Sequence, residues 1–331
     1  MTTTRAPRRL GLALLLVGLA VLTACSGAAP GEPRMTRTNA ESRVPFGAFL
    51  GSDAAGVAAY PGFEAWLGTD SVAPSVGHTY LPGNSWRDIE IPDPYVRPWA
   101  DWAAQVPDRL LVVNVPMLTP NEPPLPDDAV RGLLEQGAAG RFDSHFQLLA
   151  QRLVTLGASR AILIPGWEMN GISYTHRCEP DPEAWKEYFR RIVGVMRSVP
   201  GQQFQFNFNS TRGTDAIPWT ECYPGDDVVD MLGMDTYDQP PGQTFDDYVR
   251  QPLGLGEQVD FAQAHGKPVS FPEWGLLRYG DRPEYVRAML AWMESQNAVF
   301  HTITDYCPSG VWECTQNPAS SQEYRSHYAP S

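Results

Sequence analysis

Apolar stretches recur at regular intervals along most of the chain, and each is short enough to form a single strand. Several of them end in Gly, Pro or a polar residue, as buried strands commonly do. The eight strands predicted in this way span residues 45–50, 73–80, 109–117, 160–168, 203–209, 228–237, 268–274 and 298–306. No internal repeat or linker interrupts the series, which indicates one domain rather than two.

The segments between the predicted strands have the apolar spacing of helices. The clearest are Asp143 to Leu156, Asp181 to Val199 and Arg282 to Gln296, which begin with helix-starting residues. A chain of 331 residues with 43% hydrophobic content can bury one large core. Because strand and helix alternate eight times, we expect an α/β fold with a single (β/α)8 TIM barrel over residues 44–331.

The N-terminal segment has the composition of a targeting signal. Arginines at residues 5–9 precede an apolar stretch over 10–22, and the sequence "LTAC" ends at Cys25. This stretch is shorter than the roughly 20 residues that a membrane span needs. The tetrapeptide resembles a bacterial lipobox, which implies a lipoprotein signal peptide over 1–24 and lipidation of the thiol outside the plasma membrane. A flexible tether over 25–43 follows, and an ordinary secreted protein is the alternative.

Cysteine usage also favours export. Apart from Cys25, the chain has Cys178, Cys222, Cys307 and Cys314, an even number that predicts two disulfides in an oxidising compartment. Three pairings are possible. Because Cys307 and Cys314 close a short loop, we expect that pair, which leaves Cys178 with Cys222 to join loops after successive strands. The spacing does not suggest a metal site, and we expect neither metal nor cofactor.

The charge and the aromatic content narrow the class of partner. A formal net charge of −13 argues against nucleic acid, because a nucleic-acid binder needs a basic face to displace counterions. The chain has 10 Trp, 13 Tyr and 13 Phe. Most of these rings fill the core, but the apolar faces of sugars also stack on such rings. A carbohydrate partner therefore fits the composition.

Functional side chains of a TIM barrel lie at the C-terminal ends of its strands and in the loops that follow. Among the residues at those positions, Glu168 and Glu273 stand out because each ends an apolar strand. Burying a charge there is costly unless the charge has a function. Either one alone is more simply a surface carboxylate or the partner of an arginine. Two at matched strand ends favour a catalytic pair. The other residues at these ends are His78, Tyr80, Asn114, Asn170, Asn209, Asp235, Tyr237, Trp274, Asp305 and Tyr306.

Three segments carry a resemblance to a known family. They are "PGWEMNG" at 165–171, "YPGDDVVDMLGMDTYD" at 223–238 and "FPEWG" at 271–275. Together they resemble glycoside hydrolase family 26, best known for β-mannanases, whose acid/base and nucleophile end the fourth and seventh barrel strands. The resemblance extends over most of the predicted barrel in order and spacing.

The resemblance implies a role for each matched residue. Glu168 becomes the general acid/base, Glu273 the nucleophile, and Tyr237 the tyrosine that orients the nucleophile and holds it ionised. Such a pair hydrolyses glycosides with retention of configuration and needs no cofactor. Trp167 stands where many family members carry His, and a Trp can stack on a sugar or donate one hydrogen bond but cannot titrate. The expected substrate is a neutral β-linked polysaccharide, with β-mannan first and β-glucan or β-xylan as alternatives.

Further residues are candidates for sugar binding because of their type and their place beside the strand ends. Each has a simpler interpretation as core packing or as a local hydrogen-bond partner. These candidates are His78, Tyr80, Trp86, Trp167, Asn170, Asn209, Trp274 and Trp312. Asp226 and Asp227 are interpreted as caps of a helix that begins near them.

Two hypotheses of different classes remain. The first is a retaining endo-glycosidase, a lipid-anchored monomer that meets the membrane only through its anchor and acts on a polysaccharide or oligosaccharide. A variant of it hydrolyses the cell's own envelope glycan. The second is a surface carbohydrate-binding lipoprotein that keeps the barrel without turnover. Because both Glu168 and Glu273 are present, the enzyme is favoured.

Overall fold

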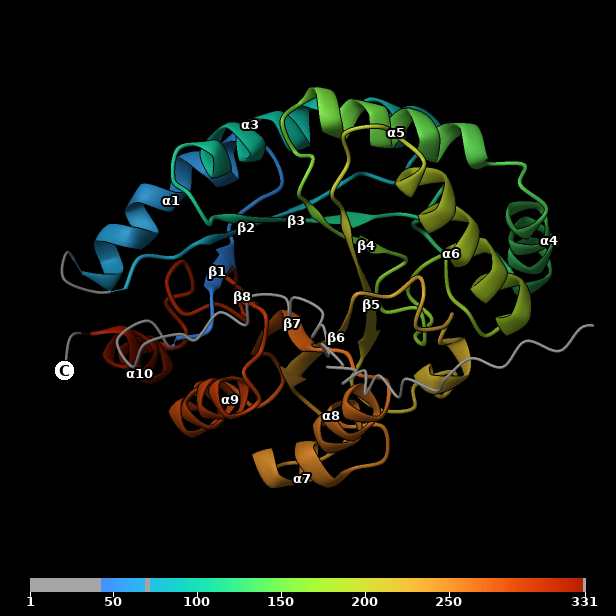
Figure 1. Cartoon of the computed structure of the whole chain (residues 1–331). Helices are drawn as coiled ribbons and strands as arrows, with labels where there is room; N and C mark the ends of the chain where they lie inside the picture. The colour runs from blue at the N-terminus through green and yellow to red at the C-terminus, as the bar shows by residue number, and fades with distance from the viewer. Residues whose placement is uncertain (1–42, 69–71, 330–331) are drawn as a thin grey trace, which may run out of the picture. The chain divides into compact units, whose positions relative to one another are not determined.

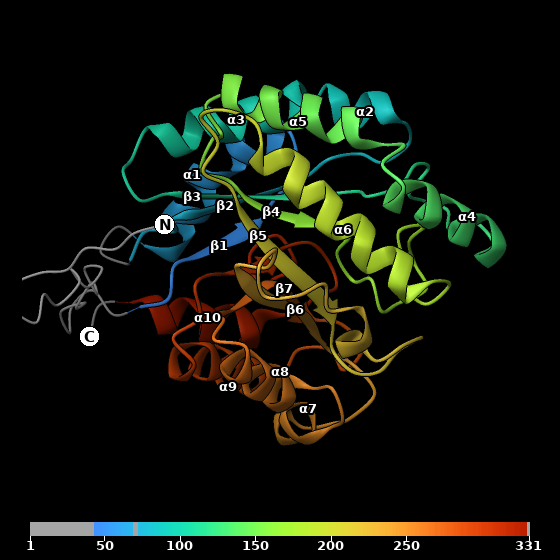
Figure 2. The ribbon, with the colours of Figure 1, turned by 45° about the vertical axis from the view of Figure 1, so that its right-hand side comes forward.

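The computed structural model describes residues 43–68 and 72–329, and a compact unit begins at Arg43. The expected signal peptide, Cys25 and the tether up to residue 42 lie outside these residues. Within the described part, parallel strands alternate with helices that lie outside them (Figures 1 and 2). The strands are β1 (Phe46–Phe49), β2 (Val76–Tyr80), β3 (Leu110–Val115), β4 (Ile162–Pro165), β5 (Gln205–Thr211), β6 (Met231–Asp238), β7 (Val269–Leu276) and β8 (His301–Thr304).

The strands form one parallel sheet in the order β1-β8-β7-β6-β5-β4-β3-β2. Between the two remaining edges, the Ser75 amide donates to the Phe46 carbonyl at 2.9 Å. The Tyr60 hydroxyl accepts from the Ala48 amide of β1 at 3.2 Å and donates to the Val76 carbonyl of β2. These bonds link β1 to β2 and bring the sheet round to a nearly closed barrel. The prediction of a single (β/α)8 barrel is confirmed, and every strand boundary lies within three residues of its predicted position.

The helices cover the outer face of the barrel. They are α1 (Ala54–Leu67), α2 (Trp86–Glu90), α3 (Asp93–Ala104), α4 (Asp127–Ala138), α5 (Asp143–Thr155), α6 (Pro182–Arg197), α7 (Phe245–Arg250), α8 (Leu255–Ala264), α9 (Pro283–Ser295) and α10 (Pro318–Tyr328), with a 3-10 helix at Trp219–Cys222. At the start of α6, the Asp181 carboxylate accepts from the Ala184 amide, and Pro182 occupies the first turn, where no amide hydrogen is needed. Among residues 43–68 and 72–329, no helix has the length and hydropathy of a membrane span.

The strand sequences follow from burial on both faces. Along β3 and β4, Val113 and Leu163 pack outward against the helices, whereas Val112, Ile162 and Ile164 pack inside the barrel. A parallel strand covered on both sides is apolar at almost every position, so it appears in the sequence as a continuous run. The same burial makes a carboxylate at the end of such a run conspicuous.

Both expected disulfides are confirmed. Cys178 bonds to Cys222 and joins the segments that follow β4 and β5, and Cys307 bonds to Cys314 in the segment after β8. The active-site face of the barrel is therefore cross-linked at two places.

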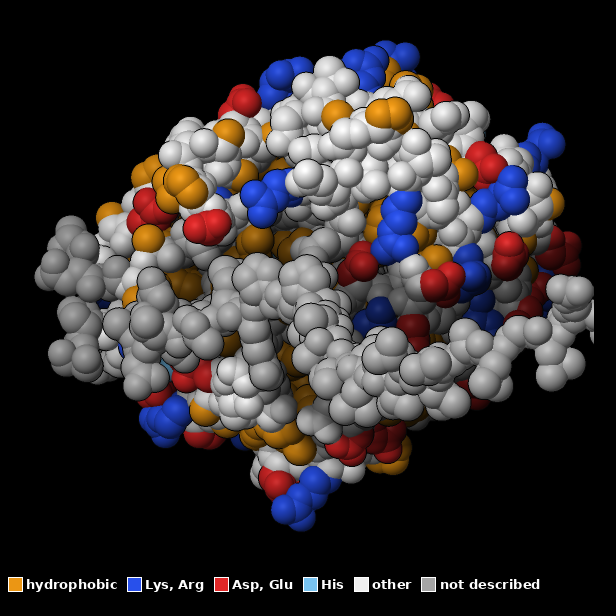
Figure 3. Space-filling view, viewed as in Figure 1, with side chains coloured by type: hydrophobic (Ala, Val, Ile, Leu, Met, Phe, Trp, Pro, Cys, Tyr) orange, Lys and Arg blue, Asp and Glu red, His pale blue; other side chains and the backbone are white. Residues whose placement is uncertain are grey.

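The helix expected to begin at Asp226 and Asp227 is not there, so that interpretation was wrong. Asp226 accepts a hydrogen bond from the Tyr223 hydroxyl at 2.8 Å, and Asp227 forms a two-bond ion pair with Arg190 of α6. Strand β6 starts only four residues later, at Met231, which leaves no room for a helix. Elsewhere on the surface, acidic and basic side chains lie next to one another (Figure 3), and exposed pairs of this kind contribute little to stability.

Candidate active site

Glu168 lies three residues after strand β4 and Glu273 lies within β7, and both side chains are partly open to solvent while the two strands are otherwise buried. Glu168 has a φ of 52°, in the left-handed region that non-glycine residues seldom adopt. Two backbone bonds hold this turn: the Glu168 amide donates to the Asn209 carbonyl at 3.0 Å, and the Gly166 amide to the Val115 carbonyl at 3.0 Å. The neighbouring strands therefore impose the backbone conformation that places the Glu168 carboxyl.

The Glu273 carboxylate is held by two tyrosines from other strands. The Tyr80 hydroxyl donates to Oε1, and the Tyr237 hydroxyl donates to Oε2 at 2.9 Å. The Tyr237 oxygen also lies 2.7 Å from Oγ1 of Thr304, which can donate to it. Burial raises the pKa of Glu273, but these two hydrogen bonds favour its ionised form and lower the pKa again.

The environment of Glu168, unlike that of Glu273, disfavours the ionised form of the carboxyl. Burial first, and then the negative charge of Glu273, raise its pKa to about 8, with smaller contributions from Asp215 and Glu122. Among the described residues, no hydrogen-bond donor reaches the Glu168 carboxyl to stabilise its charge. At neutral pH the proton of the pair therefore resides on Glu168, and the hydrogen bonds from Tyr80 and Tyr237 favour the ionised form of Glu273. One acid and one carboxylate are the groups that acid-assisted nucleophilic substitution needs.

Asp235 is a third carboxyl group in this site. Its side chain is buried and accepts a 2.6 Å hydrogen bond from Nδ2 of Asn209. Burial and the charges of Glu273 and Glu168 raise its pKa well above the usual value, and the hydrogen bond from Asn209 opposes this rise. Asp235 lies two residues before Tyr237 on β6, and alternate residues of a strand face the same side. The D-x-Y spacing was the signal that could have identified it.

A cavity of about 370 Å³ adjoins the carboxylate pair. The rings of Tyr80, Tyr95, Trp167 and Tyr174 line it together with polar groups, among them Glu122. The Trp167 ring lies 5.6 Å from that of Tyr80 and 4.9 Å from that of Tyr174, both edge-to-face. Aromatic walls with a few polar groups are typical of sites that bind sugars.

Comparison with known proteins agrees with this geometry. Residues 151–270 match the model of glycosyl hydrolase family 26. This match confirms the resemblance to glycosyl hydrolase family 26 over that segment. The matched segment includes Glu168, Asp235 and Tyr237 and ends three residues before Glu273. The match indicates a glycoside hydrolase, in agreement with the prediction from the sequence.

Solved structures support the same fold. A Bacillus subtilis mannanase is 16% identical, with a TM-score of 0.61 and 84% of each chain covered. A modular Cellulomonas fimi endo-β-1,4-mannanase is 18% identical with a TM-score of 0.63, over 87% of this chain and 71% of that one. A Bacteroides ovatus β-mannanase is 14% identical with a TM-score of 0.63, over 87% and 88%. No curated protein sequence matches the chain.

Two of the sugar-binding candidates, Tyr80 and Trp167, lie in the cavity. His78 lies beneath it and is fully buried, with Nδ1 2.9 Å from Oγ1 of Thr302 and Nε2 2.8 Å from Oδ1 of Asn114. Burial lowers the pKa of His78 to about 4, so the ring is neutral. It stacks on the Tyr80 ring at 4.8 Å. His78 therefore supports Tyr80 and has no free edge for a sugar.

The two asparagine candidates are also buried within the protein. Asn170 donates to the carbonyls of Thr211 and Gly213 and accepts from the Thr211 amide at 2.9 Å, which joins the loops after β4 and β5. Asn209 donates to Asp235. Their hydrogen bonds fix the backbone and the carboxyl group around the site.

The structure does not bring the remaining three tryptophan candidates to the cavity. Trp86 stacks face to face on His145 of α5, with ring centres 4.2 Å apart. Trp274 is fully buried and donates to Nδ1 of His301 at 3.1 Å. Trp312 packs on Phe63 of α1 at 5.8 Å. Each of these rings is used in packing between elements.

Three residues near the site were not among the sugar-binding candidates. Tyr174 and Glu122 line the cavity from the segments after β4 and β3. Tyr306, two residues after β8, is 53% exposed, and its partial burial and then the charges of Glu273 and Glu168 raise its pKa. Its position at a strand end was the available signal. Tyr174 and Glu122 lie further along their loops, where a sequence gives no such signal.

Proposed function

We propose that this protein is a retaining endo-β-glycosidase that hydrolyses a neutral β-linked polysaccharide, with β-mannan as the first choice. The observation that carries the proposal is the unequal pair of carboxyl groups. Glu168 has a raised pKa and keeps its proton, whereas Glu273 receives hydrogen bonds from Tyr80 and Tyr237 that stabilise its charge. An acid and a nucleophile with these properties are what double displacement requires.

In the first step, Glu168 protonates the glycosidic oxygen while Glu273 attacks the anomeric carbon, and a glycosyl-enzyme ester forms. The ester removes the negative charge of Glu273, which is the largest charge contribution to the raised pKa of Glu168. The pKa of Glu168 then falls. As a carboxylate it takes a proton from water, and the water attacks the anomeric carbon and releases the sugar with its original configuration.

The charged residues around the cavity favour a neutral substrate. Glu122 is the charged residue of the cavity lining, and that lining contains no Lys or Arg. Glu273 lies beside the cavity, so a sugar carboxylate would meet the negative charges of Glu122 and Glu273 without a cationic partner. The similar structures are those of mannanases, which supports β-mannan as the first substrate to test.

We also propose a cellular location for the enzyme. The sequence around Cys25 supports a lipoprotein on the outer face of the plasma membrane, and two disulfides fit an oxidising compartment. Labelling of growing cells with a radioactive fatty acid tests this. We expect incorporation into the wild-type chain and none into Cys25→Ala, and equal incorporation into both would contradict it.

The function is tested by incubating the purified protein with β-mannan, mixed-linkage β-glucan, β-xylan and a uronic-acid polymer, followed by product sizing. We expect oligosaccharides of several lengths from a neutral β-glycan and no product from the uronic-acid polymer. Binding to a glycan without hydrolysis of any of them would instead support the carbohydrate-binding alternative.

A further inference from the structure

Arg212 is a buried arginine directly after β5, and it belongs to neither the carboxylate pair nor the cavity. Its side chain uses all five of its N–H groups. Nε donates to Oγ1 of Thr236 at 3.0 Å, Nη1 to the Pro241 carbonyl and to Oε1 of Gln251, and Nη2 to the carbonyls of Tyr237 and Gln239 at 3.0 and 2.8 Å. A guanidinium with every donor satisfied is fixed in orientation.

Four of the five groups that accept hydrogen bonds from Arg212 lie within residues 236–241. Arg212 binds three alternate backbone carbonyls, those of residues 237, 239 and 241, and the Tyr248 ring lies 4.0 Å from its charge centre. None of its five hydrogen bonds goes to a carboxylate, and burial lowers its pKa. Burying the Arg212 cation costs desolvation free energy, and its hydrogen bonds offset that cost while they hold the surrounding segment in place.

The strand pairing explains why residues 237–241 need hydrogen bonds from a side chain. The pairing of β5 with β6 ends at Thr211 opposite Asp235, so the next position along β5 is Arg212 itself. On the other side of β6, the register with β7 shifts between Gly233 and Thr236. Beyond Asp235, therefore, β6 has lost one of its two neighbouring strands. The Arg212 side chain supplies the hydrogen bonds that β5 no longer gives.

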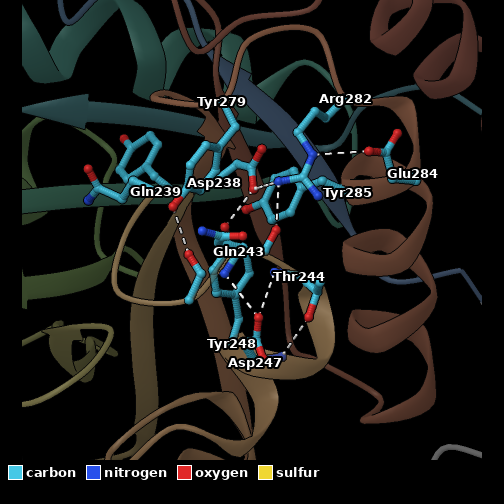
Figure 4. Close-up of polar contacts among 12 residues, drawn as sticks. Asp238, Gln239, Gln243, Thr244, Asp247, Tyr248, Tyr279, Arg282, Glu284 and Tyr285 are labelled. Atoms are coloured by element: carbon cyan, nitrogen blue, oxygen red, sulfur yellow. Dashed lines mark hydrogen bonds and ion pairs between the residues drawn. The ribbon is translucent and has the colours of Figure 1, made fainter.

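The outer side of the same segment is held by a second group. Figure 4 shows Asp238 between Tyr248 and Arg282: its Oδ1 accepts from the Tyr248 hydroxyl at 2.7 Å and from Nη1 of Arg282 at 3.1 Å. Arg282 also donates to the Gln243 carbonyl at 2.9 Å. Successive residues of a strand point to opposite faces, so Asp238 is fixed outside the barrel while Tyr237 points to the catalytic face.

We propose that Arg212 is the positioning residue for Tyr237 and, through it, for the ionised form of Glu273. The proposal rests on the proposed function. Arg212 touches neither sugar nor carboxylate. Its side chain binds the Tyr237 carbonyl itself, the Thr236 side chain before it and two backbone carbonyls after it. The Tyr237 hydroxyl must meet Oε2 of Glu273 and Oγ1 of Thr304 together. A shift of its backbone by about 1 Å lengthens the 2.9 Å bond beyond hydrogen-bonding range.

The test compares Arg212→Met and Arg212→Lys with the wild-type protein and with Arg282→Met. Arg282→Met is the matched control, because it removes a cation from the other side of the same segment without touching the Tyr237 carbonyl. The readouts are the pH dependence of kcat/KM, the separate values of kcat and KM, and the titration of the Glu273 carboxyl by 13C NMR, assigned with Glu273→Gln.

For Arg212→Met we expect a higher pKa of Glu273, an acidic limb of kcat/KM moved to higher pH, and a loss of roughly tenfold in kcat with little change in KM. Arg212→Lys, with fewer donors, is expected to show a smaller shift in the same direction. On a Tyr237→Phe background, Arg212→Met should no longer move the Glu273 titration. Arg282→Met is expected to lower Tm and leave the acidic limb in place.

An unchanged Glu273 titration in Arg212→Met would overturn the proposal, as would an equal shift in Arg282→Met. If Arg212→Met does not fold, Arg212→Lys decides, and a wild-type pKa of Glu273 in that variant overturns it. Failure of the proposed function is separate: the wild-type protein would then hydrolyse no glycan. The NMR titration requires no turnover and still tests the positioning role.

Discussion

Tyr237 donates a 2.9 Å hydrogen bond to Oε2 of Glu273, although the two residues come from different strands. Tyr80, which is 193 residues from Glu273 in the sequence, donates to the other oxygen. Both carboxylate oxygens are thus occupied by hydroxyl donors, and the charge of Glu273 is stabilised despite its burial. This difference in protonation between Glu273 and Glu168 determines how replacements in the site should affect activity.

Tyr237→Phe is expected to raise the pKa of Glu273, because a donor to the charged form is lost. The nucleophile must be ionised, so the acidic limb of kcat/KM should move to higher pH, with kcat reduced by roughly 10- to 100-fold. A pH–rate profile of wild type and variant measures both effects. Tyr80→Phe should act in the same direction, and an acidic limb that stays in place in both variants would contradict the assignment.

Replacement of either proposed catalytic carboxyl, Glu168 or Glu273, should reduce glycoside cleavage by several orders of magnitude. Glu168→Gln removes the proton donor, so substrates with a good leaving group such as dinitrophenolate should lose much less of their first step than natural glycans. In Glu273→Gly, azide should restore activity on such a substrate by attacking the anomeric carbon in place of the carboxylate. Wild-type rates on a polysaccharide in Glu273→Gln would exclude this residue as the nucleophile.

The pKa of Glu168 sets the basic limb of activity. Because the acid must be protonated, kcat/KM should fall as pH rises through about 8. Glu122→Gln removes a negative charge that raises this pKa, so the limb should move to lower pH. The shift should be small, since Glu122 is exposed and solvent screens its charge. Movement of the limb to higher pH would contradict the assignment.

The same raised pKa affects folding stability. Glu168 has an ordinary pKa of 4.5 and a folded value of about 8, so the folded state binds its proton more tightly than the unfolded state does. Its contribution is complete below pH 4.5 and is lost as pH rises through about 8. Glu168→Gln should therefore unfold at a higher temperature than wild type at pH 9, and at a similar one at pH 4. A lower Tm of the variant at pH 9 would contradict this.

The disulfide from Cys178 to Cys222 should contribute more to stability than the one from Cys307 to Cys314. Their sequence separations are 44 and 7 residues, and the loss of loop entropy in the unfolded chain gives about 4 and about 2 kcal/mol. Urea unfolding of Cys178→Ser/Cys222→Ser and of Cys307→Ser/Cys314→Ser measures the two free energies. The opposite order would contradict the entropic account.

The sequence allowed the barrel and the carboxylate pair to be predicted because both depend on local patterns. Parallel strands such as β3 and β4 bury both faces, so they appear as apolar runs, and Glu168 and Glu273 interrupt such runs at their ends. The tryptophan candidates depended on no such pattern. Trp274 and Trp312 lie in loops or at strand ends, but whether a ring meets a sugar or another helix depends on packing that spacing does not specify.

Contacts between distant segments were likewise beyond prediction. The bond from Tyr80 to Glu273 and the five bonds of Arg212 join residues whose proximity is set only once the strands are in order. His78 was a reasonable sugar ligand by position, but its partners Asn114 and Thr302 come from two other strands and enclose it.

The central claim, that Glu273 is the nucleophile of a retaining glycosidase, is tested most directly by trapping the glycosyl-enzyme. A 2-deoxy-2-fluoro-β-mannosyl or mannobiosyl fluoride slows the second step, and mass spectrometry of the digested protein locates the sugar. We predict one added sugar per chain, on the peptide that contains Glu273, and none on Glu273→Gln. A label on Glu168, or hydrolysis of the same fluoride with inversion and no covalent label, would contradict the account.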